Sequence, residues 1–107
     1  MTKFRFTGAR EAERPRAFLV TAAVGRVMYA DAAAELAELV TSDGMDVAGT
    51  LSARRDKPDA ATYLGSGKIE EIKALAESQH CQVVVFDAAL SAAQERNIAQ
   101  IVGLAVM

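Results

Sequence analysis

The chain has 107 residues, of which 51% are hydrophobic and 24% charged, and its formal net charge is -2 at pH 7. These values indicate one small globular domain, and its acidic balance excludes binding to nucleic acid or membrane through bulk charge. The single cysteine, Cys81, excludes an internal disulfide and a metal site built from several cysteines.

The hydrophobic runs are too short to span a membrane, and the N-terminus lacks the apolar core of a signal peptide. We therefore expect a soluble, cytoplasmic protein with no membrane partner. Residues 1–15 alternate charged and small side chains, which predicts a flexible lead-in. The folded domain is expected to span residues 16–107.

The periodicity of apolar residues predicts seven elements in chain order. They are a strand over 17–22, a helix over 32–42, a strand over 45–53, a helix from 66 or 67 to 79, a strand over 83–86, a helix from 91 to 102 and a strand over 104–107. Ser91 and Gln94 match a capping box at the start of the last helix, and Gly49 marks a bulge or a close backbone contact in the second strand.

Strict alternation of strands and helices is typical of parallel sheets with helical crossovers. The sequence therefore predicts an α/β fold: a small, open, mostly parallel four-stranded sheet with helices packed on its faces. Ligands of such sheets bind at the carboxyl ends of the strands. The loop predicted over 54–68 leaves a strand at that edge, which makes it the candidate functional segment.

This loop concentrates positive charge on an acidic chain. Four cations and one aromatic residue on it are candidates to neutralise RNA phosphates and to stack on a base, namely Arg54, Arg55, Lys57, Lys68 and Tyr63. Asp56 and Asp59 partly cancel the positive field and cap turns around Pro58. The alternative is a solvated surface loop that keeps the domain soluble.

The glycines near the end of the loop suggest an anion-binding site, because free amides at a helix N-terminus attract phosphate. The phosphate-loop pattern fails, since Thr62 stands at its first glycine and Ile69 where a serine or threonine is required. A dinucleotide fingerprint fails as well. The weaker prediction that survives is one docked anion at Gly65, Ser66 and Gly67.

The sequence offers no catalytic machinery. Asp87, after a predicted central strand, has no paired carboxylate nearby in sequence, and we expect it to cap the next turn. No nucleophile lies beside a base, and His80 has no companion that would complete a metal site. We therefore predict no catalytic residue and no metal ligand in this chain.

Two segments resemble a known family. Residues 54–72, with the sequence RRDKPDAATYLGSGKIEEI, are similar to the loop and helix of the N-terminal domain of HflX-type ribosome-associated GTPases. Residues 85–97, VFDAALSAAQERN, resemble the same family's strand followed by FD, LS and QxRN. The resemblance covers about residue 16 to the end of the chain.

The resemblance implies a domain that docks on the 50S ribosomal subunit and its rRNA, in a GTP-binding protein that splits or rescues ribosomes. It makes Arg54, Arg55, Lys57, Tyr63 and Lys68 candidate RNA contacts. In the family a helical linker and a GTPase domain follow this domain, so GTP and magnesium are expected there. The present chain is expected to be a non-enzymatic fragment or a truncated product.

Two other functions remain open at this point. One is a nucleotide- or small-molecule-binding α/β module that uses the helix start at 65–68. The other is a structural module that orients a partner domain. The final predicted strand also leaves an edge that could pair with a second copy in a dimer.

Overall fold

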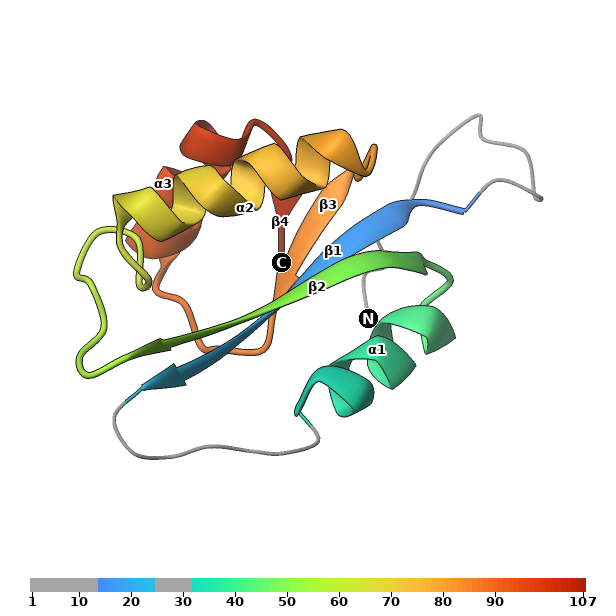
Figure 1. Ribbon diagram of the computed structural model, residues 1–107, viewed down its shortest axis with the longest axis horizontal. Helices are drawn as coiled ribbons and strands as arrows, with labels where there is room; N and C mark the ends of the chain where they lie inside the picture. Colours follow the sequence, from blue (N-terminus) through green and yellow to red (C-terminus); the bar gives the residue numbers. More distant parts are fainter. Residues whose placement is uncertain (1–13, 25–31) are drawn as a thin grey trace.

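The computed structural model of the chain describes residues 14–24 and 32–107. Figure 1 shows a twisted sheet with helices on both of its faces. The elements follow one another as β1 (Arg16–Val24), α1 (Ala32–Ser42), β2 (Asp46–Arg55), α2 (Ser66–Ser78), β3 (Val83–Phe86), α3 (Ala92–Val102) and β4 (Ala105–Val106). The predicted α/β fold is confirmed, whereas the predicted lead-in at 1–15 lies outside the described residues apart from its last two positions.

The sheet has the strand order β2-β1-β3-β4, and every pair of neighbours is parallel. The chain first moves outward from β1 to β2 and then returns past β1 to place β3 and β4 on the other side. Figure 1 shows α1 below the sheet and α2 and α3 above it. The direction of winding therefore reverses between β1 and β3, the place where open α/β sheets form a crevice.

The core has one cluster of buried residues on each face of the sheet. Phe18 and Val20 of β1 lie in the cluster with α2 and α3, whereas Leu19 packs with α1 on the other face. All four residues of β3 are buried. The continuous apolar runs of β1 and β3 thus belong to strands covered on both faces, as predicted for them.

Strand β2 is an edge strand, and it has a bulge next to Gly49, where the sequence predicted a bulge or a close backbone contact. Ala17 pairs with Val47 and Phe18 with Gly49, which leaves Ala48 as the extra residue. Gly49 also allows a close approach, because a Cβ there would overlap Oε1 of Gln79 at the end of α2. That oxygen is buried and has no hydrogen-bond partner in the described part of the chain.

The start of α3 has the predicted capping box. The Ser91 hydroxyl accepts from the backbone N–H of Gln94 at 3.0 Å, and Gln94 Oε1 accepts from the backbone N–H of Ser91 at 2.9 Å. The helix therefore begins where the sequence indicated, with two of its free donors satisfied.

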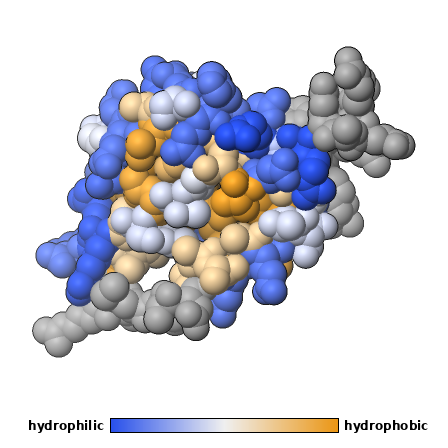
Figure 2. Space-filling view, turned by 45° about the vertical axis from the view of Figure 1, so that its right-hand side comes forward, coloured by the Kyte–Doolittle hydropathy of each residue, from blue (hydrophilic) through white to orange (hydrophobic). Residues whose placement is uncertain are grey.

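Hydrophobic residues reach the surface in places. The face in Figure 2 carries apolar patches in its middle, with hydrophilic residues gathered above and to the left of them. The large hydrophobic side chains that are exposed in the described ranges are Leu39 of α1, 66% exposed, and Met107, 39% exposed. None of the described helices has the length and apolar character needed to cross a membrane.

Candidate functional site

The candidate segment is shorter than the predicted loop over 54–68. Strand β2 continues to Arg55, with Arg54 paired to Ala23 and Arg55 to Val24 of β1, and α2 already begins at Ser66. The predicted strand ended at residue 53, two residues before β2 ends. Two consecutive arginines on an exposed edge strand have the composition that is typical of a loop. What remains is the β2–α2 connection, residues 56–65.

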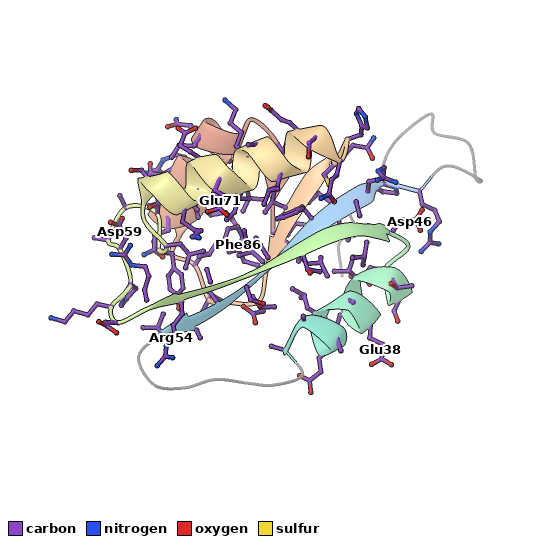
Figure 3. All side chains as sticks on the ribbon, viewed as in Figure 1. Glu38, Asp46, Arg54, Asp59, Glu71 and Phe86 are labelled. Carbon is purple, nitrogen blue, oxygen red and sulfur yellow. The ribbon has the colours of Figure 1, made fainter. Side chains whose placement is uncertain are left out.

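The two arginines lie on opposite faces of the sheet, because successive side chains of a strand alternate. Arg55 contacts the β2–α2 connection on the side of α2, while Arg54 lines a hollow with Ala32 of α1. In Figure 3, Arg54 lies on the α1 side of the end of the sheet and Asp59 on the other. The predicted cluster of cations is therefore divided between two surfaces.

Arg55 holds the two ends of the connection together. Its Nε donates to the carbonyl of Lys57 at 2.9 Å, and its Nη1 donates to the carbonyl of Leu64 at 3.0 Å. The guanidinium lies so near Gly65 that a Cβ there would come within 2.6 Å of Nη1, and Gly65 has φ 91°. Only glycine fits both conditions.

Asp59 organises the middle of the connection. Its Oδ1 accepts from the backbone N–H groups of Ala61 and Thr62 at 2.8 and 2.9 Å and from the Thr62 hydroxyl at 3.2 Å. The hydrogen bonds from the backbone of Thr62 and Ala61 hold the pKa of Asp59 below its ordinary value, with a smaller contribution from the charge of Arg55. Asp59 is ionised at neutral pH and stabilises the turn, as its predicted capping role requires.

The other three predicted contacts differ in their surroundings. Lys68 Nζ forms an ion pair with Glu71 Oε1 at 2.9 Å, one turn along α2. Tyr63 is half-buried against the core and has φ 69°, an uncommon value for a residue with a side chain. Lys57 lies on the connection and is exposed. Each role in RNA binding stays a prediction.

The predicted anion site lies at the first turn of α2. Gly65 is the N-cap and supplies no side-chain hydrogen bond, and Ser66 and Gly67 are exposed. The helix start exists as predicted, and anion binding there also stays a prediction.

A hollow of about 200 Å³ lies at the carboxyl ends of β1, β2 and β3, on the α1 side. It is lined by Arg54, by Asp87 and by two hydroxyls, those of Thr21 and Ser52, which lie 2.7 Å apart. Asp87 Oδ1 accepts from the backbone N–H of Ala22 at 2.9 Å. Asp87 therefore holds the end of β1 at the switch point. The sequence had suggested a different role, in which Asp87 caps its own following turn.

Cys81 is a buried, free cysteine. Burial raises the pKa of the Cys81 thiol, although the charge of Arg16 opposes this in part, so the thiol is protonated at neutral pH. Within residues 14–24 and 32–107, no three His, Cys, Asp or Glu side chains are grouped so that they could hold a metal ion.

Comparison with known proteins connects this arrangement to one family. The family model described as "GTP-binding GTPase N-terminal" matches residues 30–107. The chain is 36% identical over 74 residues to GTPase HflX of Alkalihalophilus pseudofirmus, which covers 69% of this chain and 18% of that protein. It is 38% identical over 64 residues to GTPase HflX of Escherichia coli, which covers 60% of this chain and 15% of that protein.

The match includes the β2–α2 connection and the segment from β3 through α3, the two stretches on which the predicted resemblance rests. The chain spans less than a fifth of the length of these two relatives. It belongs to the family of N-terminal domains of HflX-type GTP-binding proteins.

Proposed function

We propose that this chain docks on the 50S ribosomal subunit and its rRNA, as the N-terminal domain of a cytoplasmic HflX-type GTP-binding protein that splits or rescues ribosomes. In this proposal the chain supplies the docking surface. GTP and magnesium bind in the GTPase domain of the full-length protein, which a helical linker joins to the present domain. The family match and the position of the β2–α2 connection support the proposal.

The observation that carries the proposal is the fixed shape of the connection at the carboxyl edge of the sheet. Its backbone is bound by Arg55 and Asp59, and Leu64 is buried, with 2% of its surface exposed. Lys57 and Pro58 stay exposed on its outer side. A preformed loop loses little conformational freedom on binding, which favours its use as a recognition element.

The electrostatic part of the contact rests on few residues. Lys57 is the exposed lysine of the connection, Arg54 is exposed on the α1 side, and Lys68 is paired with Glu71. Because the chain carries a net charge of -2, binding to RNA depends on these local cations rather than on the overall field. Each cation that meets a phosphate releases counterions and adds to the salt dependence of binding.

The test replaces Lys57 with alanine and measures the affinity of the chain for isolated 50S subunits between 50 and about 200 mM salt. We expect Lys57→Ala to weaken binding and to lower the slope of log K against log salt by about one. Lys73→Ala, in the middle of α2, removes the same charge away from the connection and serves as the control. Arg55→Ala is unsuitable as a charge test because it also releases Lys57 and Leu64.

Three results would contradict the proposal. The unmodified chain fails to bind the subunit at low salt, Lys57→Ala binds like the unmodified chain, or Lys73→Ala lowers the slope as much as Lys57→Ala. A rise in melting temperature with millimolar ATP or GTP, without ribosome binding, would favour the nucleotide-binding alternative instead.

A further inference from the structure

The β2–α2 connection is attached to a second, distant part of the chain. Two side chains of α3 donate hydrogen bonds to its backbone: Gln94 Nε2 to the carbonyl of Asp59 and Asn97 Nδ2 to the carbonyl of Ala61, both at 3.0 Å. Because Gln94 and Asn97 are three residues apart in a helix, they lie on one face. That face is turned toward the connection.

These two bonds add to hydrogen bonds within the turn itself, and the Asp59 carbonyl accepts from both the Tyr63 N–H and Gln94 Nε2. The Asp59 carboxylate already accepts from the N–H groups of Ala61 and Thr62, and the backbones of Asp59 and Tyr63 bond to each other at 2.8 and 2.9 Å. The two carbonyls that Gln94 and Asn97 bind lie within the same turn. The turn is therefore held from inside by Asp59 and from outside by α3.

The backbone of this turn needs such support. Tyr63 has φ 69°, in the left-handed region that costs a residue with a side chain conformational energy. The next residue, Leu64, must then enter the core, and its N–H donates to the carbonyl of Thr62 at 2.7 Å. A conformation of this kind persists when the surrounding contacts determine it.

Gln94 has a second role that makes the arrangement testable. Its Oε1 accepts from Ser91 in the capping box of α3, while its Nε2 donates to the connection. One carboxamide thus joins the start of α3 to the turn. A carboxylate at this position retains an acceptor for Ser91 and lacks the donor for Asp59.

We propose that Gln94 and Asn97 are positioning residues that hold the β2–α2 connection in the shape in which it docks on RNA. This inference rests on the proposed function. The two amides need not touch RNA, and they act by preventing the turn from opening. Removing their donors increases the freedom that binding must freeze, so binding weakens although no phosphate contact is lost.

The variants are Gln94→Glu, Asn97→Asp and the uncharged Asn97→Leu, each of which removes one donor to the connection. Gln100→Glu adds the same negative charge at an exposed position of α3 and is the control for charge. Two measurements are made on every variant: hydrogen exchange of the amides of Ala61, Thr62 and Tyr63, and 50S affinity as a function of salt.

We expect faster exchange of the three amides and roughly five- to tenfold weaker binding for each donor-removing variant. The slope of log K against log salt should stay that of the unmodified chain, in contrast to Lys57→Ala. Asn97→Leu should agree with Asn97→Asp, and Gln100→Glu should change neither exchange nor affinity.

Unchanged exchange in the donor-removing variants would show that the amides do not hold the turn. Faster exchange with unchanged affinity would overturn the positioning role and leave the proposed function standing. Failure of the unmodified chain to bind 50S would overturn the proposed function and the positioning role together, whatever the exchange result.

Discussion

The carboxylate of Asp59 holds the backbone of the β2–α2 connection in its turn. Its carboxylate accepts three hydrogen bonds from two following residues, Ala61 and Thr62, and its backbone pairs with Tyr63. Hydrogen bonds to the charged form lower the pKa of an acid. Because the pKa is lower in the folded protein than in the unfolded chain, the ionised carboxylate stabilises the native state.

The contribution of Asp59 should therefore depend on pH. It is fully present above the unfolded pKa of about 4 and is lost as pH falls through the lower, folded pKa. We expect Asp59→Asn, which keeps an acceptor but not the charge, to melt below the unmodified protein at pH 6. This difference in melting temperature should shrink below about pH 4.

Thermal melts of both proteins at several pH values would test this. Asp56→Asn, at an exposed position of the same connection, is the control for removing a charge nearby. A difference between Asp59→Asn and the unmodified protein that stays constant down to pH 2 would contradict the assigned pKa direction.

The stability of helix α3 depends on the capping box at its first turn, formed by Ser91 and Gln94. Replacing Ser91 with alanine removes the acceptor for the N–H of Gln94 and leaves the reciprocal bond from the backbone of residue 91 to Gln94 Oε1. We expect a loss of about 1 kcal/mol, equivalent to a fall in melting temperature of about 4 °C or more for a domain of this size.

Ser78→Ala provides the matched control for this prediction. The Ser78 hydroxyl donates to the carbonyl of Leu75 inside the last turn of α2 and caps no helix start. Its removal should change stability by less than about 0.5 kcal/mol. Equal effects of the two substitutions on the denaturation midpoint would argue against the capping role of Ser91.

The elements were predictable where local chemistry decides them. Short continuous runs of apolar, branched and aromatic residues in β1 and β3 favour buried strands, and Ser91 with Gln94 indicates a helix start without reference to the rest of the fold. Arg54 and Arg55 were assigned to the loop because two charged residues in a row do not resemble a strand. They belong to β2 because their backbones pair with Ala23 and Val24 of β1, a contact that the local sequence does not reveal.

The candidate site was predictable in position and not in its internal contacts. The alternation of strands and helices along the chain placed the connection at the carboxyl edge of a parallel sheet, and Asp59 was expected to cap a turn. The bond between Gln94 and Asp59 joins residues 35 positions apart. The sequence accounts for Gln94 through the capping box of α3 alone. Because that role already gives Gln94 a hydrogen-bond partner, nothing in the sequence indicates its second partner, Asp59.

At the scale of the whole molecule, the described residues on the two faces of the sheet form core clusters of unequal size. Among residues 14–24 and 32–107, the cluster beneath α2 and α3 contains 11 buried residues, while the cluster beneath α1 contains 7. Helix α1 is attached mainly through Leu36 and Val40, and its Leu39 points to solvent with 66% of its surface exposed. Local opening is easiest where few apolar contacts are buried, so α1 is the first element expected to detach.

Truncations on the two faces should therefore differ in cost. Ile72 is fully buried between α2 and the sheet, whereas Leu36 is 8% exposed under α1. We expect Ile72→Ala to cost about 4 kcal/mol and Leu36→Ala about 2 kcal/mol, measured by urea denaturation followed by circular dichroism. A loss of 4 kcal/mol is a large share of the roughly 5–15 kcal/mol that stabilises a domain, so Ile72→Ala should populate the unfolded state.

Hydrogen exchange distinguishes a weaker face from a uniformly weaker protein. Leu36→Ala should speed exchange in α1 while the amides of α2 and β3 keep their protection, because the opening of α1 leaves the larger cluster intact. Ile72→Ala should speed exchange in every element, since α2 covers the cluster that joins β1 to β3. Equal acceleration of α1 and α2 by Leu36→Ala would mean that the two faces unfold as one unit.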